Sequence, residues 1–541
     1  MRTITLATLC LLLSACGDKP QSASTAPEAD INRIKGHMAF LADDLLEGRD
    51  TGSRGHEIAA KYVASQFQQL GLRPAGTDGY MQRVPFIQAF LEQNSPSFTL
   101  TTAAGSASLA YPKDYTTSPS TLYAHAQVSG ELVFVGYGIE APRLNHNDYA
   151  NIDVAGKIVV VLTGKPASFP SEEGAHFASG SEKARYAAEH GAIGMLTIST
   201  PANEKRRPYQ SRLNYIHTPR VRWLTPDGQP HGAEPALLNS AYLSIPAAQK
   251  LFADAPRSLD DIYAELELDG TPQGFALNAR VDFSKDSQFK RISSPNVAAI
   301  LPGTDPELKN EYVIYSAHTD HIGLAKTVEK DNINNGAMDN ATGTSVLLET
   351  ARLMSEGQPP KRSVLFLAVT GEEKGLLGAD YFAHYPTVSK SALVANVNLD
   401  MPVLTFEASD IIAFGAEHSS LKGIVEQAAE KVGLTLGQDP WPAEAIFTRS
   451  DHYPFVKQGI PAVFVVPGMT AKDPDVDGEA KWQEFLAKHY HKPSDELNAS
   501  FNWQAAKTFT QVNLMIGQTL ANTAARPVWN EGDFFGDTFA K

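Results

Sequence analysis

The chain has 541 residues, and its 61 Asp and Glu outnumber its 46 Lys and Arg, giving a formal net charge of −15 at pH 7. At roughly 100–200 residues per domain this length predicts two to four domains, and 43% hydrophobic residues suffice for packed cores. The acidic balance, without a long Lys/Arg run, argues against nucleic acid or an anionic membrane surface as the main partner. Both cysteines, Cys10 and Cys16, lie at the N-terminus, so metal chemistry in the body of the chain must use His and carboxylates.

The first residues have the pattern of a signal peptide: a positive start, an apolar stretch over 4–13 and small residues before Cys16. The stretch is well short of the roughly 20 apolar residues that a membrane-spanning helix needs. The run Leu13-Ser14-Ala15-Cys16 resembles a bacterial lipobox, in which Cys16 carries the lipid anchor; ordinary cleavage is the alternative. We therefore expect a signal peptide at 1–15, a tether at 16–29, and a lipid-anchored protein of the bacterial envelope, on the periplasmic side with the outer membrane favoured, or a secreted one.

Two helices are predicted after the tether, because apolar residues recur there at spacings of three and four. The first helical face comprises Ile31, Ile34, Met38, Leu41 and Leu45, and the second comprises Ile58, Tyr62, Val63, Phe67 and Leu70. From about residue 127 the pattern changes to short β-branched strands at 131–139 and 156–164, then a helix at 182–192 and a buried strand at 193–198. The stretch 201–235 has no clear periodicity, and its length indicates a functional flap or a mobile excursion.

The block 127–285 resembles the protease-associated (PA) domain, a small β-rich module often inserted into secreted peptidases. The resemblance rests on Gly136-Tyr137-Gly138-Ile139, Asn147-Asp148-Tyr149, the strand at 156–161 and the helix end at 187–192.

Strands and helices alternate after Ser293, which predicts an α/β sandwich with a largely parallel central sheet. Functional residues in such sheets lie at the carboxyl ends of strands. Metal-competent residues stand at or near four such positions: His318 with Asp320, then Asp339, then Glu372-Glu373, then Asp400. Each alone is more often a helix cap or a solvated turn, but the ordered set predicts a metal site. Asp320 is expected to accept a hydrogen bond from the second ring nitrogen of His318.

This order of residues resembles the zinc aminopeptidases of peptidase family M28. The resemblance implies an α/β zinc-exopeptidase sandwich, with a central mixed, largely parallel sheet flanked by helices and an inserted β-rich PA domain. The domains would be the N-terminal part of the peptidase at 30–126, the PA insertion at 127–285, the catalytic domain at 286–525 and a tail at 526–541.

The same resemblance implies roles for the candidate residues around two Zn²⁺ ions. His318 and Asp400 would bind one ion, Glu373 would bind the other, and Asp339 would bridge them. Glu372 would be the general base acting on a metal-bridging water, so the catalytic set is Glu372 with Asp320 and Tyr490.

One further His ligand is needed, and two segments compete for the role. His491, within Tyr490-His491-Lys492-Pro493-Ser494-Asp495, fits the family's last zinc ligand, and Tyr490 would stabilise the oxyanion. Asp451 and His452 would instead line the substrate pocket or support the metal shell. His321 is expected to be structural. Mn²⁺ or Co²⁺ could occupy the same ligands.

The expected function is a di-zinc exopeptidase, most simply an aminopeptidase that removes N-terminal residues from peptides. A carboxypeptidase or a glutaminyl cyclase on the same scaffold, or a non-catalytic binding protein on a degenerate scaffold, are the alternatives. Peptides are the expected partners, membrane attachment would be through the N-terminal lipid, and the sequence leaves the oligomeric state and side-chain preference open.

Overall fold

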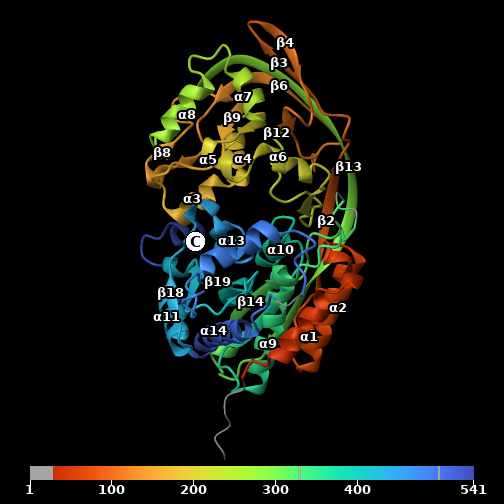
Figure 1. Ribbon diagram of the computed structural model, residues 1–541, viewed down its shortest axis with the longest axis vertical. Coiled ribbons are helices and arrows are strands. Elements are labelled where there is room, and N and C mark those ends of the chain that lie inside the picture. Colours follow the sequence, from red (N-terminus) through yellow and green to blue (C-terminus); the bar gives the residue numbers. More distant parts are fainter. Residues whose placement is uncertain (1–27, 327, 329, 498–499, 541) are drawn as a thin grey trace, which may run out of the picture.

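The computed structural model describes residues 28–326, 328, 330–497 and 500–540. The predicted signal peptide, Cys16 and most of the tether lie outside these described residues. Within the described part of the chain, no helix is both long and apolar enough to cross a membrane. Two sheets follow one another along the long axis of the molecule, each with a large hydrophobic core of its own (Figure 1).

The lower sheet in Figure 1 runs in the order β11-β2-β13-β15-β14-β16-β19-β17-β18. Its four inner strands are parallel and almost wholly buried, since helices cover both faces. These are β15 (Ser363–Val369), β14 (Tyr312–His318), β16 (Leu393–Asn398) and β19 (Ala462–Pro467). The others are β1 (Arg73–Pro74), β2 (Met81–Leu91), β11 (Arg220–Trp223), β17 (Asp410–Phe414) and β18 (Thr435–Gly437).

Helices surround the lower sheet, and α1, α9, α11 and α14 form one packed layer (Figure 1). Their bounds are α1 (Ile31–Leu41), α2 (Arg54–Gln69), α9 (Gly343–Glu356), α10 (Leu377–His384), α11 (Leu421–Lys431), α12 (His452–Val456), α13 (Gly478–Lys488) and α14 (Trp503–Asn522). The first helix ends earlier than its apolar pattern predicts. Asp43 caps a new 3-10 turn through the backbone N–H of Leu45, which leaves the Leu45 side chain 84% exposed.

The upper sheet runs in the order β4-β3-β13-β6-β9-β10-β12-β5. Its strands are β3 (Ser97–Thr102), β4 (Gly105–Leu109), β5 (Tyr115–Thr116), β6 (His125–Phe134), β9 (Ile158–Leu162), β10 (Gly194–Ile198) and β12 (Asn239–Leu243), with a small hairpin of β7 (Glu140–Ala141) and β8 (His146–Asn147). Its helices are α3 (Ser171–Ala178), α4 (Gly180–Glu189), α5 (Pro201–Arg206), α6 (Tyr209–Arg212), α7 (Ile245–Leu251) and α8 (Leu259–Glu267).

One strand, β13 (Phe275–Leu301), belongs to both sheets (Figure 1, green arch). Its first half pairs with β3 and β6, and its second half pairs with β2 and β15. The predicted domain boundary at 285/286 therefore falls inside a continuous strand. The stretch 201–235 also differs from the prediction, because it contains α5, α6 and β11 instead of forming an irregular flap. The predicted fold class, a mixed and centrally parallel α/β sheet flanked by helices with a second β-rich unit, is confirmed.

The C-terminal segment ends in α15 (Phe534–Phe539) and packs against both halves of the molecule. His418 of the lower half is almost fully buried, donates from Nδ1 to Asp533 of this segment at 2.6 Å, and pairs through Nε2 with Glu172 on α3. Burial lowers the pKa of His418, but the hydrogen bonds to Asp533 and Glu172 outweigh it and raise the pKa to about 10. A charged histidine therefore joins three segments that are far apart in the sequence.

Replacing His418 by Gln is expected to destabilise the protein by on the order of 3 kcal/mol near pH 6.5, because two buried carboxylates lose their cation. The folded-state pKa of His418 lies above its unfolded value near 6.5, so its contribution is complete below that pH and is lost as pH rises toward 10. Thermal unfolding of His418→Gln and wild type at several pH values checks this. Glu417→Gln, at the exposed neighbouring position, is the control and should behave like wild type.

Candidate metal centre

Three neighbouring parallel strands deliver most of the candidate site. β14 ends at His318, while Glu372 and Glu373 follow β15, and Asp400 lies two residues after β16. Because the carboxyl ends of parallel strands meet at one edge of the sheet, these side chains converge there. Asp339 comes from the turn that leads into α9, and His491 from the segment after α13.

The donor atoms form two groups that share Asp339. In the first group, His318 Nε2 lies 3.0 Å from Asp400 Oδ1 and 3.3 Å from Asp339 Oδ1. In the second group, His491 Nε2 lies 3.3 Å from Asp339 Oδ2 and 3.2 Å from Glu373 Oε2. Asp339 thus directs one carboxylate oxygen to each group, as a bridging ligand must.

Glu372 lies next to the first group, but its carboxylate is not one of the closely spaced donors of that group. Its Oε2 is 4.0 Å from His318 Nε2, farther than any other carboxylate of that group. Burial raises the pKa of Glu372 well above its usual value, and the charges of Asp400 and Glu373 add to this, while His318 opposes them. Its neighbour Glu373 behaves oppositely: burial would raise its pKa, but His491 and His321 hold that pKa well below its usual value. Two adjacent glutamates therefore have distinct protonation behaviour.

His321 lies within the second group, although its sequence position predicts a structural residue. Its Nδ1 is 2.7 Å from Glu373 Oε1 and 4.0 Å from Asp339 Oδ2. Neither ring nitrogen of His321 has a well-aligned hydrogen bond among the described residues, and the ring is fully buried. The signal that could have identified it is its spacing, three residues after His318, where the chain has already left the strand.

The role expected for the Asp320 side chain is corrected by the structure. His318 Nδ1 lies 3.0 Å from the backbone carbonyl oxygen of Asp320, whereas the carboxylate is 4.0 Å away. The carboxylate instead accepts hydrogen bonds from Thr51 Oγ1 at 2.9 Å and from the backbone N–H of Glu372 at 3.2 Å. Asp320 therefore positions the backbone at Glu372 and orients His318 through its main chain.

Two further supports were not identified from the sequence. Asp495 accepts hydrogen bonds from the backbone N–H groups of Met338 and Asp339, at 2.9 and 3.0 Å, and so fixes the turn that carries the shared carboxylate. Ser450 donates to Asp400 Oδ2, which leaves Oδ1 facing His318. Both supports come from segments more than 40 residues away from the strand-end motifs.

The remaining candidates lie around the two groups. The Tyr490 ring stacks on His491 with the ring centroids 3.8 Å apart. Asp451 is fully buried, and its burial, reinforced by Asp400 and Asp320, raises its pKa well above the usual value. His452 lies apart from the donor atoms, with Phe447 and Phe464 centroids 5.3 and 5.5 Å from its own.

The residues fit a bound cation by distance and by donor type. Two donors on one tetrahedral zinc ion, each about 2.0–2.1 Å from it, lie roughly 3.3 Å apart. The separations of 3.0–3.3 Å within both groups match that value. Glu373 Oε1 is also buried without a well-aligned hydrogen bond among the described residues, although His321 Nδ1 lies 2.7 Å away. Buried carboxylates in such numbers need a cation. His318, Asp339 and Asp400 bring three donor atoms close enough to hold one, and so do His321, Asp339 and Glu373.

A parallel-centred α/β sheet with His and carboxylate donors at its carboxyl edge defines the class of metal-dependent hydrolases. Within that class, residues 296–517 match the model of peptidase family M28, and residues 128–224 match the PA domain. The two matched ranges fall on different parts of the molecule: the M28 match covers most of the lower sheet, and the PA match covers much of the upper one. These matches confirm the two resemblances that the sequence predicted, to family M28 and to the PA domain.

Individual relatives match parts of the chain. Aminopeptidase YwaD of Bacillus subtilis (strain 168) is 29% identical over 217 residues, which are 39% of this chain and 41% of that protein. Transferrin receptor protein 2 of Mus musculus is 27% identical over 305 residues, 52% of this chain and 35% of that protein. The chain thus spans less than half the length of these relatives. The solved aminopeptidase from Aneurinibacillus sp. strain AM-1 shares the fold, with a TM-score of 0.54 and 20% identity over 92% of this chain and 96% of that one.

Proposed function

We propose that this protein is a di-zinc exopeptidase, and specifically an aminopeptidase that removes N-terminal residues from peptides. The observation that carries the proposal is the pair of donor groups sharing Asp339, with Glu372 beside them and outside the donor contacts. The match of residues 296–517 to a peptidase family supports peptides as substrates.

One zinc ion would be held by His318, Asp339 and Asp400, and the other by Asp339, Glu373 and His491. His and carboxylate ligands without cysteine are typical of catalytic zinc sites that keep an exchangeable position. Bound zinc would supply Lewis-acid activation of the attacking water and of the scissile carbonyl. His321 supports the second site through Glu373 or adds a ligand to it.

Glu372 is the general base of the proposed mechanism. It takes a proton from the attacking water and delivers it to the leaving amine. The Glu372 carboxylate is free for this role because it is 4.0 Å from His318 Nε2 and belongs to neither donor group. Tyr490 would donate its hydroxyl to the developing oxyanion, and the stacking of its ring on His491 supports this role. Asp320 holds the backbone at Glu372 and so fixes the base relative to His318.

A library of peptides that differ only in a free or an acetylated N-terminus tests the assignment. We expect release of N-terminal residues from the free peptides, loss of this release with a chelator, and recovery with added zinc. Release from the carboxyl end would favour a carboxypeptidase, and cyclisation of N-terminal glutamine a glutaminyl cyclase. Absence of any turnover in zinc-loaded protein would favour a binding protein, a possibility raised by the match to a transferrin receptor.

We also propose attachment to the bacterial envelope through a lipid on Cys16, on the basis of the lipobox-like run Leu13–Cys16. The enzyme would then act on peptides at the periplasmic side or outside the cell. Metabolic labelling with a fatty acid, compared between wild type and Cys16→Ser, tests this.

A further inference from the structure

A cavity of about 660 Å³ lies between the upper sheet and the 443–449 segment of the lower half. Eight Lys or Arg residues line it, against two acidic residues, Glu234 and Glu444. The lining therefore has an excess of positive charge, whereas the chain as a whole has a net charge of −15. Five of the eight basic residues come from the 201–235 stretch: Arg206, Arg207, Arg212, Arg220 and Arg222.

Five of the eight cations have no carboxylate partner among the described residues: Lys183, Arg212, Arg220, Arg222 and Lys285. The side chain of Arg220 has no hydrogen bond or ion pair within the described part of the chain, although it is accessible inside the cavity. Arg222 donates to the carbonyl oxygen of His231 at 2.7 Å, and the buried Lys285 Nζ donates to Thr117 Oγ1 at 2.9 Å.

Neither acidic lining residue forms an ion pair with Arg220, Arg222 or Lys285, although the charge of Glu234 opposes the lowering of the Arg222 pKa. Glu444 is shared by Arg207 at 3.0 Å, Arg206 at 3.5 Å and Arg449 at 3.8 Å. Burial and the nearby Arg220 charge lower the pKa of Lys285 to about 7, and the same two causes lower that of Arg222 to about 10. Like charges enclosed together are costly unless an anion joins them.

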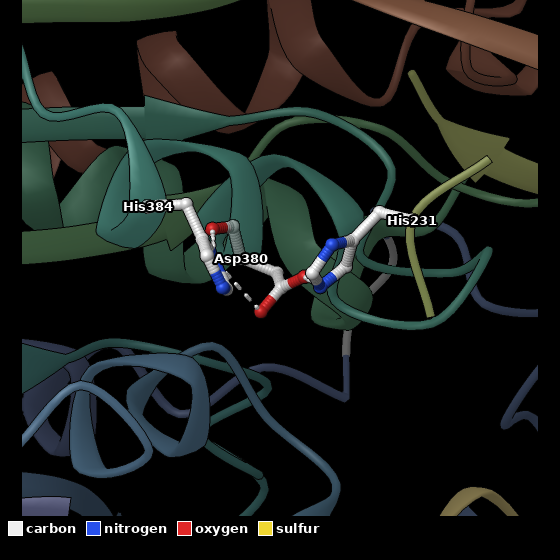
Figure 2. Close-up of side chains that lie close together, drawn as sticks. All are labelled: His231, Asp380 and His384. Atoms are coloured by element: carbon white, nitrogen blue, oxygen red, sulfur yellow. Dashed lines mark hydrogen bonds and ion pairs between the residues drawn. The ribbon is translucent and has the colours of Figure 1, made fainter. Parts of the chain in front are cut away.

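The 201–235 stretch, which carries five of these arginines, packs against α10 of the lower half of the molecule. Figure 2 shows His231, which follows β11, facing Asp380 and His384 of α10. His231 Nε2 lies 3.5 Å from the Asp380 carboxylate, which also accepts a hydrogen bond from Trp223 Nε1 at 2.8 Å. The His231 ring stacks on Trp223 with centroids 3.9 Å apart. The 201–235 stretch therefore lines the cavity and is held in place by its contacts with α10.

The cavity also adjoins the candidate metal centre along the chain. Arg449 lines the cavity, and the next residue, Ser450, donates to the metal-site carboxylate of Asp400. A peptide whose N-terminus lay at the metal centre would have to extend along this segment to reach the arginines. The volume lies within the roughly 300–1,000 Å³ of ordinary ligand pockets.

We propose that this cavity binds carboxylates of the substrate, so that the enzyme prefers acidic peptides. Arginine guanidinium groups pair with carboxylates through two parallel hydrogen bonds, and Arg220 and Arg222 are available for such pairing. The carboxylate is either an acidic side chain downstream of the scissile bond or the C-terminus of the peptide. This inference rests on the proposed peptidase function for its substrate class.

A peptide series with one N-terminal residue tests the proposal. It varies downstream Asp against Asn, C-terminal carboxylate against amide, and length. We expect kcat/KM to be about tenfold higher for the carboxylate-bearing members, mainly through KM, and the preference to fall as ionic strength rises. The Asp/Asn and acid/amide comparisons identify which carboxylate is recognised.

Arg220→Gln should abolish this preference, Arg220→Lys should retain part of it, and Arg220→Glu should favour peptides with downstream Lys. Lys205→Gln is the matched control, because Lys205 is an exposed cation of the same stretch outside the cavity lining. An aminoacyl-arylamide, which carries no carboxylate, should be cleaved equally by all of these variants. Circular dichroism confirms that each variant is folded.

Equal kcat/KM for acidic and neutral peptides, or a preference that survives Arg220→Gln, would overturn the proposal while leaving the peptidase assignment standing. If no peptide is cleaved, the peptidase assignment fails. Binding of a labelled acidic peptide, measured by fluorescence anisotropy, then tests separately whether the cavity binds carboxylates. Binding that weakens about tenfold in Arg220→Gln but not in Lys205→Gln supports an acidic-peptide site. Binding that is absent or equal in both variants refutes it.

Discussion

Replacing Glu372 by Gln is expected to lower kcat by about 10³-fold while leaving the zinc content unchanged, since a positioned general base contributes roughly 10²–10⁴-fold. The amide keeps the shape of the side chain but cannot accept the proton of the attacking water. Metal binding should survive, because Glu372 is 4.0 Å from His318 Nε2 whereas the donor pairs of the two groups lie at 3.0–3.3 Å. Steady-state kinetics combined with elemental analysis measure both quantities.

Glu373→Gln is the matched control for this experiment. It makes the same chemical change one residue away, but its oxygens face His321 and His491, so this variant should lose zinc. The contrast separates the loss of a base from the loss of a ligand. A Glu372→Gln enzyme with a near-wild-type rate would refute the assignment of the base, and one that lacks zinc would make Glu372 a ligand.

The positions of the central donors could be predicted because they depend on local pattern and strand direction. The sequence marks three buried strands as continuous β-branched and apolar runs. The first ends at His318, and the other two are followed by Glu372-Glu373 and by Asp400. Once those strands are parallel, their carboxyl ends must meet, so convergence of the four side chains follows from topology. The same reasoning identified α1, α2 and α4, because the apolar spacing along a helix is set by the helical turn itself.

Contacts between distant segments could not be predicted in the same way. The hydrogen bonds from Thr51 to Asp320, and from the Met338 N–H to Asp495, depend on how loops far apart in the sequence fold back. His321 was missed for a related reason, because it lies beyond the end of β14, where strand alternation no longer sets side-chain direction. Periodicity carries information within an element and loses it in the loops that complete a site.

The 201–235 stretch shows a second limit of sequence reasoning. Its Arg and Pro content hides β11, a short strand that pairs with β2 at the edge of the lower sheet. Edge strands are specified by their partner as much as by their own residues. The stretch thereby links the upper half of the molecule to the lower sheet, which a flap or mobile excursion would not do.

The second large expected effect is the loss of zinc when the last histidine ligand is replaced, which distinguishes His491 from His452 as that ligand. His491→Gln is expected to lose one of the two proposed zinc ions, and with it nearly all activity, because its Nε2 lies 3.3 Å from Asp339 and 3.2 Å from Glu373. His452→Gln should keep both ions, since the His452 ring packs near Phe447 and Phe464. Burial lowers the pKa of His452 to about 3, as expected of a neutral, packed imidazole.

Elemental analysis of the two variants, purified side by side after equal exposure to zinc, measures this difference directly. Unfolding temperatures measured with and without a chelator add a readout that is independent of turnover, because zinc binding stabilises the folded state. The chelator-dependent shift should be large in wild type and His452→Gln and smaller in His491→Gln. Full zinc occupancy in His491→Gln together with a loss in His452→Gln would reverse the assignment and move the second ion toward α12.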